Sequence, residues 1–535
     1  MKRLISGLLV MVMLCGLLAG CGGKKDDVST EGAKLTVGIP QKSTITDYDN
    51  NAFTQYLEEK TGINIKFSYF SSTASEYKQQ VALMASSGDE LPDVLMGFKD
   101  FGTRLISDYG EDGYFLDLTD LIDEYADVYK EKYKTLTDTQ KRYVQLKCGA
   151  MDSDALYAMP RVDYVMIDQI QSLTFINQTW LDAVGMQMPT TIDELYAVLQ
   201  AFKTKDPNGN GQADEIPMLG KTQIINYLMN AFVYYEEKHP YNVEKGDVYA
   251  PFTTDEYRQG LQFINKLVKE GLYSDLSFSI TASTELKNMY TPADGVAKVG
   301  IVMGHPVSYM DTSNEVAGQY VALGALGDET GKGGYYVLSD DVVYPGAMIT
   351  SYCETPEIAM KFIDCFYEDE TITRMRHGEK DVDWVEGEEG TDTYGNKVTT
   401  YVKNSVAYSE GSQTWGFVAC GILTPENYSS KAVEGNETAE RRSQILKGSA
   451  DLMTSSNIKE DTVRNLSYTI DEDDANEKYA STITEYVTSS RDEFIIGTKD
   501  VNNDADWKSY LAQFDELHLD DIVKIKQDAY GRSQK

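Results

Sequence analysis

Residues 206–217, DPNGNGQADEIP, place acidic and amide side chains at the alternate positions of a calcium-binding loop. Calcium takes about six to eight hard oxygen ligands, and an EF-hand loop supplies them in this pattern. Gly211 permits the sharp turn at position 6, whereas Pro217 stands at position 12 in place of the usual glutamate. The alternative interpretation is an Asx-rich turn without metal. The pattern predicts a calcium site whose ligands are Asp206, Asn208, Asn210, the backbone carbonyl of Gln212, Asp214 and, in place of the missing glutamate, Glu215.

The segments on either side of this loop predict what the metal does. A capping box at 191–194 begins a helix that leads into the loop. After the loop, Ile216 and Pro217 prevent a second helix and lead into an extended run. Calcium sensors act by moving a pair of helices. Because only one helix is expected here, we predict a structural metal rather than a switch.

Residues for catalysis are sparse. The sequence has no Gly-x-Ser-x-Gly motif, and GDETGKGG at 327–334 lacks both the spacing and the Ser or Thr of a phosphate-binding loop. No pair of carboxylates stands out as the acid and base of a glycosidase. We therefore expect a protein that is not an enzyme. The histidines also show no metal-ligand spacing; they are His239, His305, His377 and His518.

A sugar-binding site needs flat apolar faces together with carboxylates or amides for the hydroxyl groups. Trp384 follows GEKDVD in an expected loop, and Trp415 lies beside Gly416. Both regions lack core periodicity, so both residues are candidates for stacking on a ligand, with core packing as the alternative. Tyr157 precedes Met-Pro-Arg, where the chain is expected to cross between domains. Asp93 and Asp383 are candidate acceptors for ligand hydroxyl groups.

The elements that position such a site begin as a βαβαβ unit. This order predicts a parallel sheet with right-handed crossovers. Ligands of such sheets bind beyond the carboxyl ends of the strands, here near Gln41, Ser71 and Gly97. Three strands and two helices make up the unit: strands at 34–39, 63–70 and 91–97, and helices at 50–61 and 74–87.

Length and charge limit the class of protein. A chain of 535 residues predicts two domains. Its 49 basic and 85 acidic residues give a formal net charge of −36. Such a surface repels phosphate backbones, so nucleic acid is not an expected partner.

The first residues predict export and a lipid anchor. Lys2 and Arg3 precede a short apolar run, and Leu18-Ala19-Gly20-Cys21 resembles the bacterial lipobox, in which the cysteine carries the lipid. The alternative is an ordinary signal peptide followed by a chance cysteine. We expect a signal peptide at 1–20, a flexible tether at 21–33, and anchoring through Cys21 on the extracytoplasmic face of the cell membrane. The other cysteines of the exported chain are expected to be free and buried: Cys148, Cys353, Cys365 and Cys420.

Several segments, in order along the chain, resemble the extracellular solute-binding proteins of bacterial ABC importers, in their large oligosaccharide-binding subgroup. They include LMASSGDELPDVLMG at 83–97, the segment at 180–217, TTDEYRQGLQFINKLVKEGLYSDLSF at 253–278, ITSYCETPEIAMKFIDCFYEDE at 349–370 and WKSYLAQFDEL at 507–517. The resemblance implies a periplasmic-binding-protein-like fold of two α/β lobes joined by a hinge. The expected lobes are 34–158 with about 297–347, and about 159–296 with 348–535.

The resemblance also implies a ligand and partners. The expected ligand is an oligosaccharide held between the lobes, and the expected partners are the transmembrane subunits of an ABC permease, with the receptor acting as a monomer. Glu215 matches the variant calcium loop of this family. Two alternatives stay open: a receptor for a peptide or another cationic solute, and a surface-anchored enzyme acting on glycosides.

Overall fold

The computed structural model describes most of residues 28–533. The signal peptide, Cys21 and most of the tether lie outside the described residues. No helix among the described residues is long and apolar enough to cross a membrane. Within 28–533 the residues not described are 164–169, 171–172, 222, 281, 305, 329–332, 338–341, 393–396, 404–410, 417–418, 434, 453–458 and 460–461.

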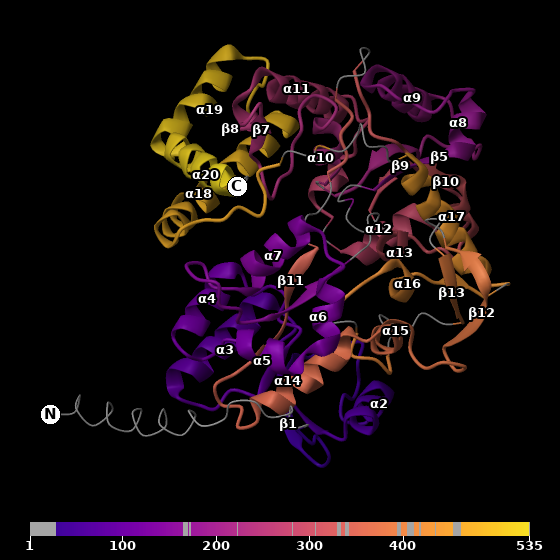
Figure 1. Cartoon of the computed structure of the whole chain (residues 1–535). Coiled ribbons are helices and arrows are strands. Elements are labelled where there is room, and N and C mark those ends of the chain that lie inside the picture. The colour runs from indigo at the N-terminus through magenta and orange to yellow at the C-terminus, as the bar shows by residue number, and fades with distance from the viewer. Residues whose placement is uncertain are drawn as a thin grey trace.

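The first lobe, in the lower half of Figure 1, is built on a six-stranded sheet of order β14-β4-β11-β3-β1-β2. β1 pairs in parallel with β2 and β3, as the βαβαβ pattern predicts, and β11 runs antiparallel to both β3 and β4. The strands are β1 (Lys34–Pro40), β2 (Asn64–Phe70), β3 (Val94–Met96), β4 (Met159–Val162), β11 (Val343–Ile349) and β14 (Gly421–Ile422).

Helices cover both faces of this sheet. Successive strand residues point to opposite faces, so the apolar side chains of one strand belong to two different cores. Val94 and Met96 belong to one core cluster, whereas Leu95 belongs to another. Met348 likewise lies in the second cluster, between two residues of the first. The helices are α2 (Ala52–Thr61), α3 (Ala74–Ser87), α4 (Thr103–Glu111), α5 (Thr119–Tyr125), α6 (Asp127–Tyr133), α7 (Asp138–Cys148), α14 (Pro356–Asp364) and α15 (Asp369–His377).

The second lobe contains a four-stranded sheet of order β10-β5-β9-β6. The strands are β5 (Thr174–Asn177), β6 (Ile216–Leu219), β9 (Val299–Met303) and β10 (Tyr320–Ala322). The helices are α8 (Gln178–Val184), α9 (Ile192–Thr204), α10 (Gln223–Met229), α11 (Asp255–Lys269), α12 (Ser283–Tyr290), α13 (Pro306–Tyr309), α17 (Glu437–Leu452), α18 (Ile470–Ile496), α19 (Asp504–Glu516) and α20 (Leu519–Ser533).

Smaller elements complete the fold. A hairpin of β7 (Asn242–Glu244) and β8 (Asp247–Tyr249) packs against α20. A three-stranded sheet lies at one side of the molecule, at the right of Figure 1, with the short helix α16 (Pro425–Tyr428) close to it. Its strands are β12 (Trp384–Thr391), β13 (Lys397–Val402) and β15 (Lys431–Ala432).

The expected lobe boundaries are wrong in their second halves. β9 and β10, expected in the first lobe, pair with β5 and β6 of the second. α14 and α15, expected in the second lobe, pack in a core of the first. The reason is that strand pairing depends on contacts between segments distant in the sequence, which local periodicity does not encode. In the part of the chain that the structure describes, there are three crossings between the lobes: between β4 and β5, between β10 and β11, and between β14 and α17.

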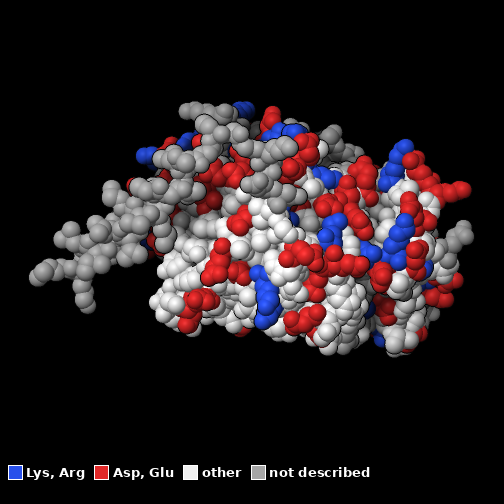
Figure 2. Space-filling model, turned by 60° about the horizontal axis from the view of Figure 1, so that its bottom comes forward, with Lys and Arg blue, Asp and Glu red and all other residues white. Residues whose placement is uncertain are grey.

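Other expectations are confirmed. The four cysteines from Cys148 to Cys420 are free and buried. The capping box at Thr191 and Glu194 begins α9. The acidic composition appears at the surface: Figure 2 shows many more Asp and Glu than Lys and Arg side chains on the face that it displays.

Candidate ligand-binding cleft

The crossings bring one edge of each sheet to the cleft between the lobes. The first crossing leaves the carboxyl end of β4 and enters the amino end of β5. The second leaves the carboxyl end of β10 and enters the amino end of β11. Because β4 runs parallel to β1 and β3, the carboxyl ends of all three strands lie along the edge from which the chain crosses. This is the edge at which α/β sheets bind ligands.

Four side chains form a polar cluster at this edge of the first lobe. Arg161, near the end of β4, is almost fully buried and places its Nε 2.8 Å from Oδ1 of Asp163. Tyr344, at the start of β11, donates a hydrogen bond to the other oxygen of Asp163 and lies beside the Arg161 guanidinium. Lys42, just after β1, donates a hydrogen bond to the carbonyl of Gly416 at 2.9 Å.

The positive charges at this edge act on one another. Burial lowers the pKa of Lys42 to about 8, with further lowering by the positive charges of Arg161 and Lys99. Like charges close together raise the free energy of the protonated amine. An acceptor-rich group bound at this edge would relieve that repulsion.

A cavity of about 700 Å³ lies between the lobes and is lined by residues of both. In Figure 1 the elements around it are α4 and α7 below and α18 and α20 above. Two interlobe contacts lie beside it. Arg104 of α4 pairs with Asp474 of α18 at 3.2 Å, and Arg142 of α7 donates to the carbonyl of Ser533 at 2.8 Å.

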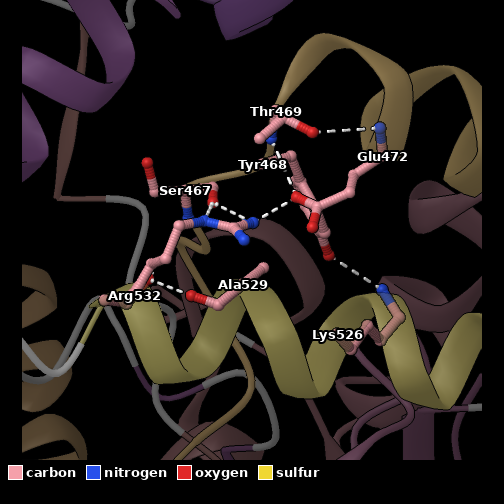
Figure 3. Close-up of polar contacts among 8 residues, drawn as sticks. Ser467, Tyr468, Thr469, Glu472, Lys526, Ala529 and Arg532 are labelled. Atoms are coloured by element: carbon pink, nitrogen blue, oxygen red, sulfur yellow. Dashed lines mark hydrogen bonds and ion pairs between the residues drawn. The ribbon is translucent and has the colours of Figure 1, made fainter.

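The second-lobe wall of the cavity is held by capping and ion-pair contacts (Figure 3). Thr469 and Glu472 form the capping box that begins α18. Arg532 of α20 reaches the Glu472 carboxylate and the Ser467 carbonyl. On the same helix, Lys526 donates to the Tyr468 hydroxyl at 3.1 Å. The contacts fix the position of α20 relative to the start of α18.

Trp415 is not a ligand-stacking residue in this structure. Its side chain is 0% exposed and lies in a first-lobe core. The ring makes edge contacts with Phe53 and Phe67, and the indole nitrogen donates to the Thr54 hydroxyl at 2.8 Å. The prediction was wrong because the local segment has no periodicity, while the partners come from distant elements.

Tyr157 and Asp93 lie at the wrong ends of their strands. Tyr157 precedes β4, and its buried ring packs so closely on Gly110 that a Cβ there would lie 2.2 Å from the ring. Asp93 precedes β3 and accepts two hydrogen bonds of 2.7 Å from Thr36 near the start of β1. Both residues therefore stabilise the edge of the sheet opposite the cleft, and their assignment to the ligand site was wrong.

Trp384 and Asp383 stay candidates that nothing in the structure tests. Trp384 is half-buried at the start of β12, and its indole nitrogen donates to the Gly378 carbonyl at 3.2 Å. Asp383 accepts the backbone N–H of Glu379 at 2.8 Å. Neither residue lines the interlobe cavity.

The predicted calcium loop lies between α9 and β6, at the end of β6 opposite the cleft. Asp206 accepts the Gly211 amide at 3.0 Å, while the Asn208 and Asn210 amides donate to Asp214 at 3.2 and 3.0 Å. Across the part of the chain that the structure describes, no group of three or more His, Cys, Asp or Glu side chains is arranged to hold a metal.

The donor set of the loop nevertheless fits calcium chemically. Glu215 has a buried carboxylate oxygen, Oε1, with no hydrogen-bond partner among the described residues. Burial raises the pKa of Glu215, and the charges of Asp206 and Asp214 raise it further. A buried acceptor beside two other carboxylates is what a hard cation would satisfy. Asn208, Asn210 and the Gln212 carbonyl would complete an all-oxygen set.

The sequence analysis missed Lys42, Arg161, Asp163 and Tyr344. The signal for Arg161 and Asp163 was present, since both lie in MPRVD, where the chain was expected to cross. No local pattern marks Lys42 or Tyr344 as their neighbours, because the sheet brings β1, β4 and β11 together from distant parts of the chain.

Residues 42–372 match the family model described as bacterial extracellular solute-binding protein. They span more than half of the chain and include Lys42 together with the ends of β3, β4 and β11 at the cleft edge. The chain belongs to this family. A Streptococcus pneumoniae relative, the fructooligosaccharide ABC transporter substrate-binding protein FusA, is 25% identical to this solute-binding protein over 97% of this chain and 96% of its own.

Solved structures share the two-lobed fold. An extracellular solute-binding protein from Bifidobacterium longum subsp. infantis has a TM-score of 0.76 and 21% identity, covering 94% of this solute-binding protein and 99% of the other chain. An EF-hand mutant of S. pneumoniae FusA, solved in complex with fructo-nystose, has a TM-score of 0.70 and 22% identity, with coverage of 94% and 99%.

Proposed function

We propose that this solute-binding protein is the lipid-anchored receptor of an ABC importer and captures an oligosaccharide between its lobes. The observation that carries the proposal is the cleft, where strand ends of the first lobe face the second lobe across three chain crossings. The name of the full-length relative FusA, a fructooligosaccharide ABC transporter substrate-binding protein, supports the ligand class and the permease partner.

The alternatives fit the cleft less well. A cationic solute or basic peptide would be repelled by the positive charges of Lys42, Lys99 and Arg161, which follow or end β1, β3 and β4. An enzyme acting on glycosides needs a pair of carboxylates about 5–10 Å apart on either side of the scissile bond. At the cleft edge, Asp163 is instead engaged by Arg161 and Tyr344. Binding and delivery of an intact ligand is therefore the proposed role.

The test uses the purified exported chain and a panel of oligosaccharides. A receptor should gain thermal stability with one sugar class, and that sugar should be recovered unchanged. Closure about the crossings should also reduce the radius of gyration in small-angle scattering. Shortened products would favour the enzyme, and confirmed binding without any change in the radius of gyration would contradict closure.

We also propose that calcium occupies the loop of 206–215, held by the side chains of Asp206, Asn208, Asn210, Asp214 and Glu215 and the Gln212 carbonyl. Supporting this, the related FusA has been studied as an EF-hand mutant, which indicates such a loop in that protein. Calcium would supply positive charge that neutralises the carboxylates and fixes the connection between α9 and β6.

The lipid anchor leads to a prediction about Cys21. Changing Cys21→Ala should release the protein into the medium or block its processing, because the thioether-linked lipid is the expected membrane attachment. Fractionation of cells that express wild type, Cys21→Ala and a control Cys353→Ala variant measures this. Cys353→Ala should stay with the membrane, and membrane retention of Cys21→Ala equal to wild type would contradict the anchor.

A further inference from the structure

The interlobe cavity is rich in cations although the chain carries a net charge of −36. Its lining includes two carboxylates, Asp473 and Glu477. Seven basic side chains line it: Arg104, Arg142, Lys147, Lys238, Arg464, Lys526 and Arg532. A charge pattern opposite to that of the whole chain indicates a local function rather than general solubility.

Three of these cations are neutralised by carboxylates outside the lining. Arg104 pairs with Asp108 and Asp474, Arg464 with Glu236, and Arg532 with Glu472. The other four have no carboxylate within ion-pair distance among the described residues; they are Arg142, Lys147, Lys238 and Lys526. Arg142 and Lys147 come from the first lobe, whereas Lys238 and Lys526 come from the second. The excess positive charge therefore faces the cavity from both sides.

Lys526 is the most constrained of the four. Its ammonium lies 4.7 Å from the ring centre of Tyr241 and 5.6 Å from that of Tyr468. It donates to the Tyr468 hydroxyl and to Oδ1 of Asn476, both at 3.1 Å. An ammonium has three N–H donors, so one is left without a protein acceptor among the described residues.

Burial disfavours the charged form of Lys526. Burial lowers the pKa of Lys526 to about 8, against the opposing effect of Asp473. The pKa of Asp473 is itself raised, first by burial and then by Glu477. Asp473 is not within ion-pair distance of Lys526, although its charge opposes part of the effect of burial. A buried cation without a paired carboxylate costs free energy that an anionic ligand would recover.

We infer that this cavity is a subsite for a negatively charged group of the ligand, a carboxylate or sulfate carried by a sugar ring, and that Lys526 is its anchor. The inference rests on the proposed function and narrows the ligand class to acidic oligosaccharides. Arg142, Lys147 and Lys238 supply further positive charge around the anion. Lobe closure brings the two pairs of cations to the same group.

Calorimetric titration with three defined tetrasaccharides tests this inference. They are a galacturonate tetrasaccharide, its carboxyl-reduced neutral counterpart, and a sulfated neutral tetrasaccharide. The intact protein should bind at least one acidic tetrasaccharide about tenfold or more tightly than the neutral counterpart at low salt, and added salt should weaken that preference. The acidic tetrasaccharide that binds with the higher affinity shows whether the subsite prefers a carboxylate or a sulfate.

Matched lysine variants test which residues cause the preference for the acidic tetrasaccharide. Lys526→Met should abolish most of the preference for the acidic ligand, whereas Lys524→Met, an exposed lysine on the same helix, should keep it. Lys147→Met tests the first-lobe wall and should reduce the preference, with Lys141→Met on the same helix as its control. Melting curves of each variant confirm folding. Because Lys147 is not a core residue, the test survives a failure of Lys526→Met to fold.

The outcomes separate the two proposals. Equal affinity for the neutral and acidic tetrasaccharides, or a preference that both Lys526→Met and Lys147→Met retain, would overturn the anionic subsite and leave the oligosaccharide receptor standing. Absence of binding to every oligosaccharide in the wider panel would overturn both.

Discussion

The Trp415→Ala variant is expected to lose about 3–5 kcal/mol of unfolding free energy, the usual cost of removing a buried aromatic side chain. Trp415 is fully buried, and its ring contacts Phe53, Phe67 and Phe366, which come from three separate elements. Its removal would leave a cavity among these three rings, and Thr54 would lose a buried hydrogen bond. Chemical denaturation followed by circular dichroism measures the loss.

Trp384→Ala is the matched control for this change. Trp384 is half-buried at the start of a strand in the small side sheet, so its loss should cost much less unfolding free energy. A wild-type melting temperature for Trp415→Ala, together with weakened sugar binding, would contradict the packing role and restore the earlier stacking interpretation.

The sequence predicted the local elements of the first lobe well. Strand 34–39, helix 74–87 and strand 63–70 agree with the structure to within about one residue. The helix ends at Gly88, which adopts the left-handed conformation of a helix cap. In the second lobe, α11 begins at Asp255 and is capped by Thr254, after Pro251–Thr253 form a turn of 3₁₀ helix.

The lobe assignment failed where pairing is non-local. Val299–Met303 and Val343–Ile349 are both continuous apolar runs, yet β9 joins the second sheet and β11 the first. An apolar strand buried on both faces carries no alternation that marks its partner. The order of strands in space therefore had to come from the structure.

The candidate site shows the same limit. Tyr157 was chosen because it precedes the expected crossing and Asp93 because of its residue type, but both precede their strands, while the cleft lies after them. Arg161 and Asp163 lie at the correct end of β4. The rule that ligands bind at the carboxyl ends of strands was thus sound, and applying it residue by residue would have favoured Asp163 over Tyr157.

Removal of the calcium ion proposed for the loop of 206–215 is expected to lower the melting temperature without a direct loss of sugar affinity. Without a cation, the buried oxygen of Glu215 has no partner among the described residues, and Asp206 and Asp214 repel it. A metal bound at about 100 times its Kd would stabilise the fold by roughly 2.7 kcal/mol. The loop precedes β6, whereas the cleft lies beyond the other end of that strand, so its loosening should leave the cleft contacts in place.

Metal analysis of the purified protein shows whether calcium is bound. Chelation then follows, and the melting temperature and the affinity for a sugar ligand are measured before and after it. Asp214→Asn should reproduce the destabilisation and lose the response to added calcium. Asp294→Asn is the control. The carboxylates of Asp214 and Asp294 both lie 3.9 Å from the Lys298 ammonium, but Asp294 is outside the proposed ligand set. A metal-free preparation of normal stability would contradict calcium binding. A large loss of sugar affinity in the still-folded, chelated protein would instead mean that the loop is coupled to the cleft, and the metal would then be more than structural.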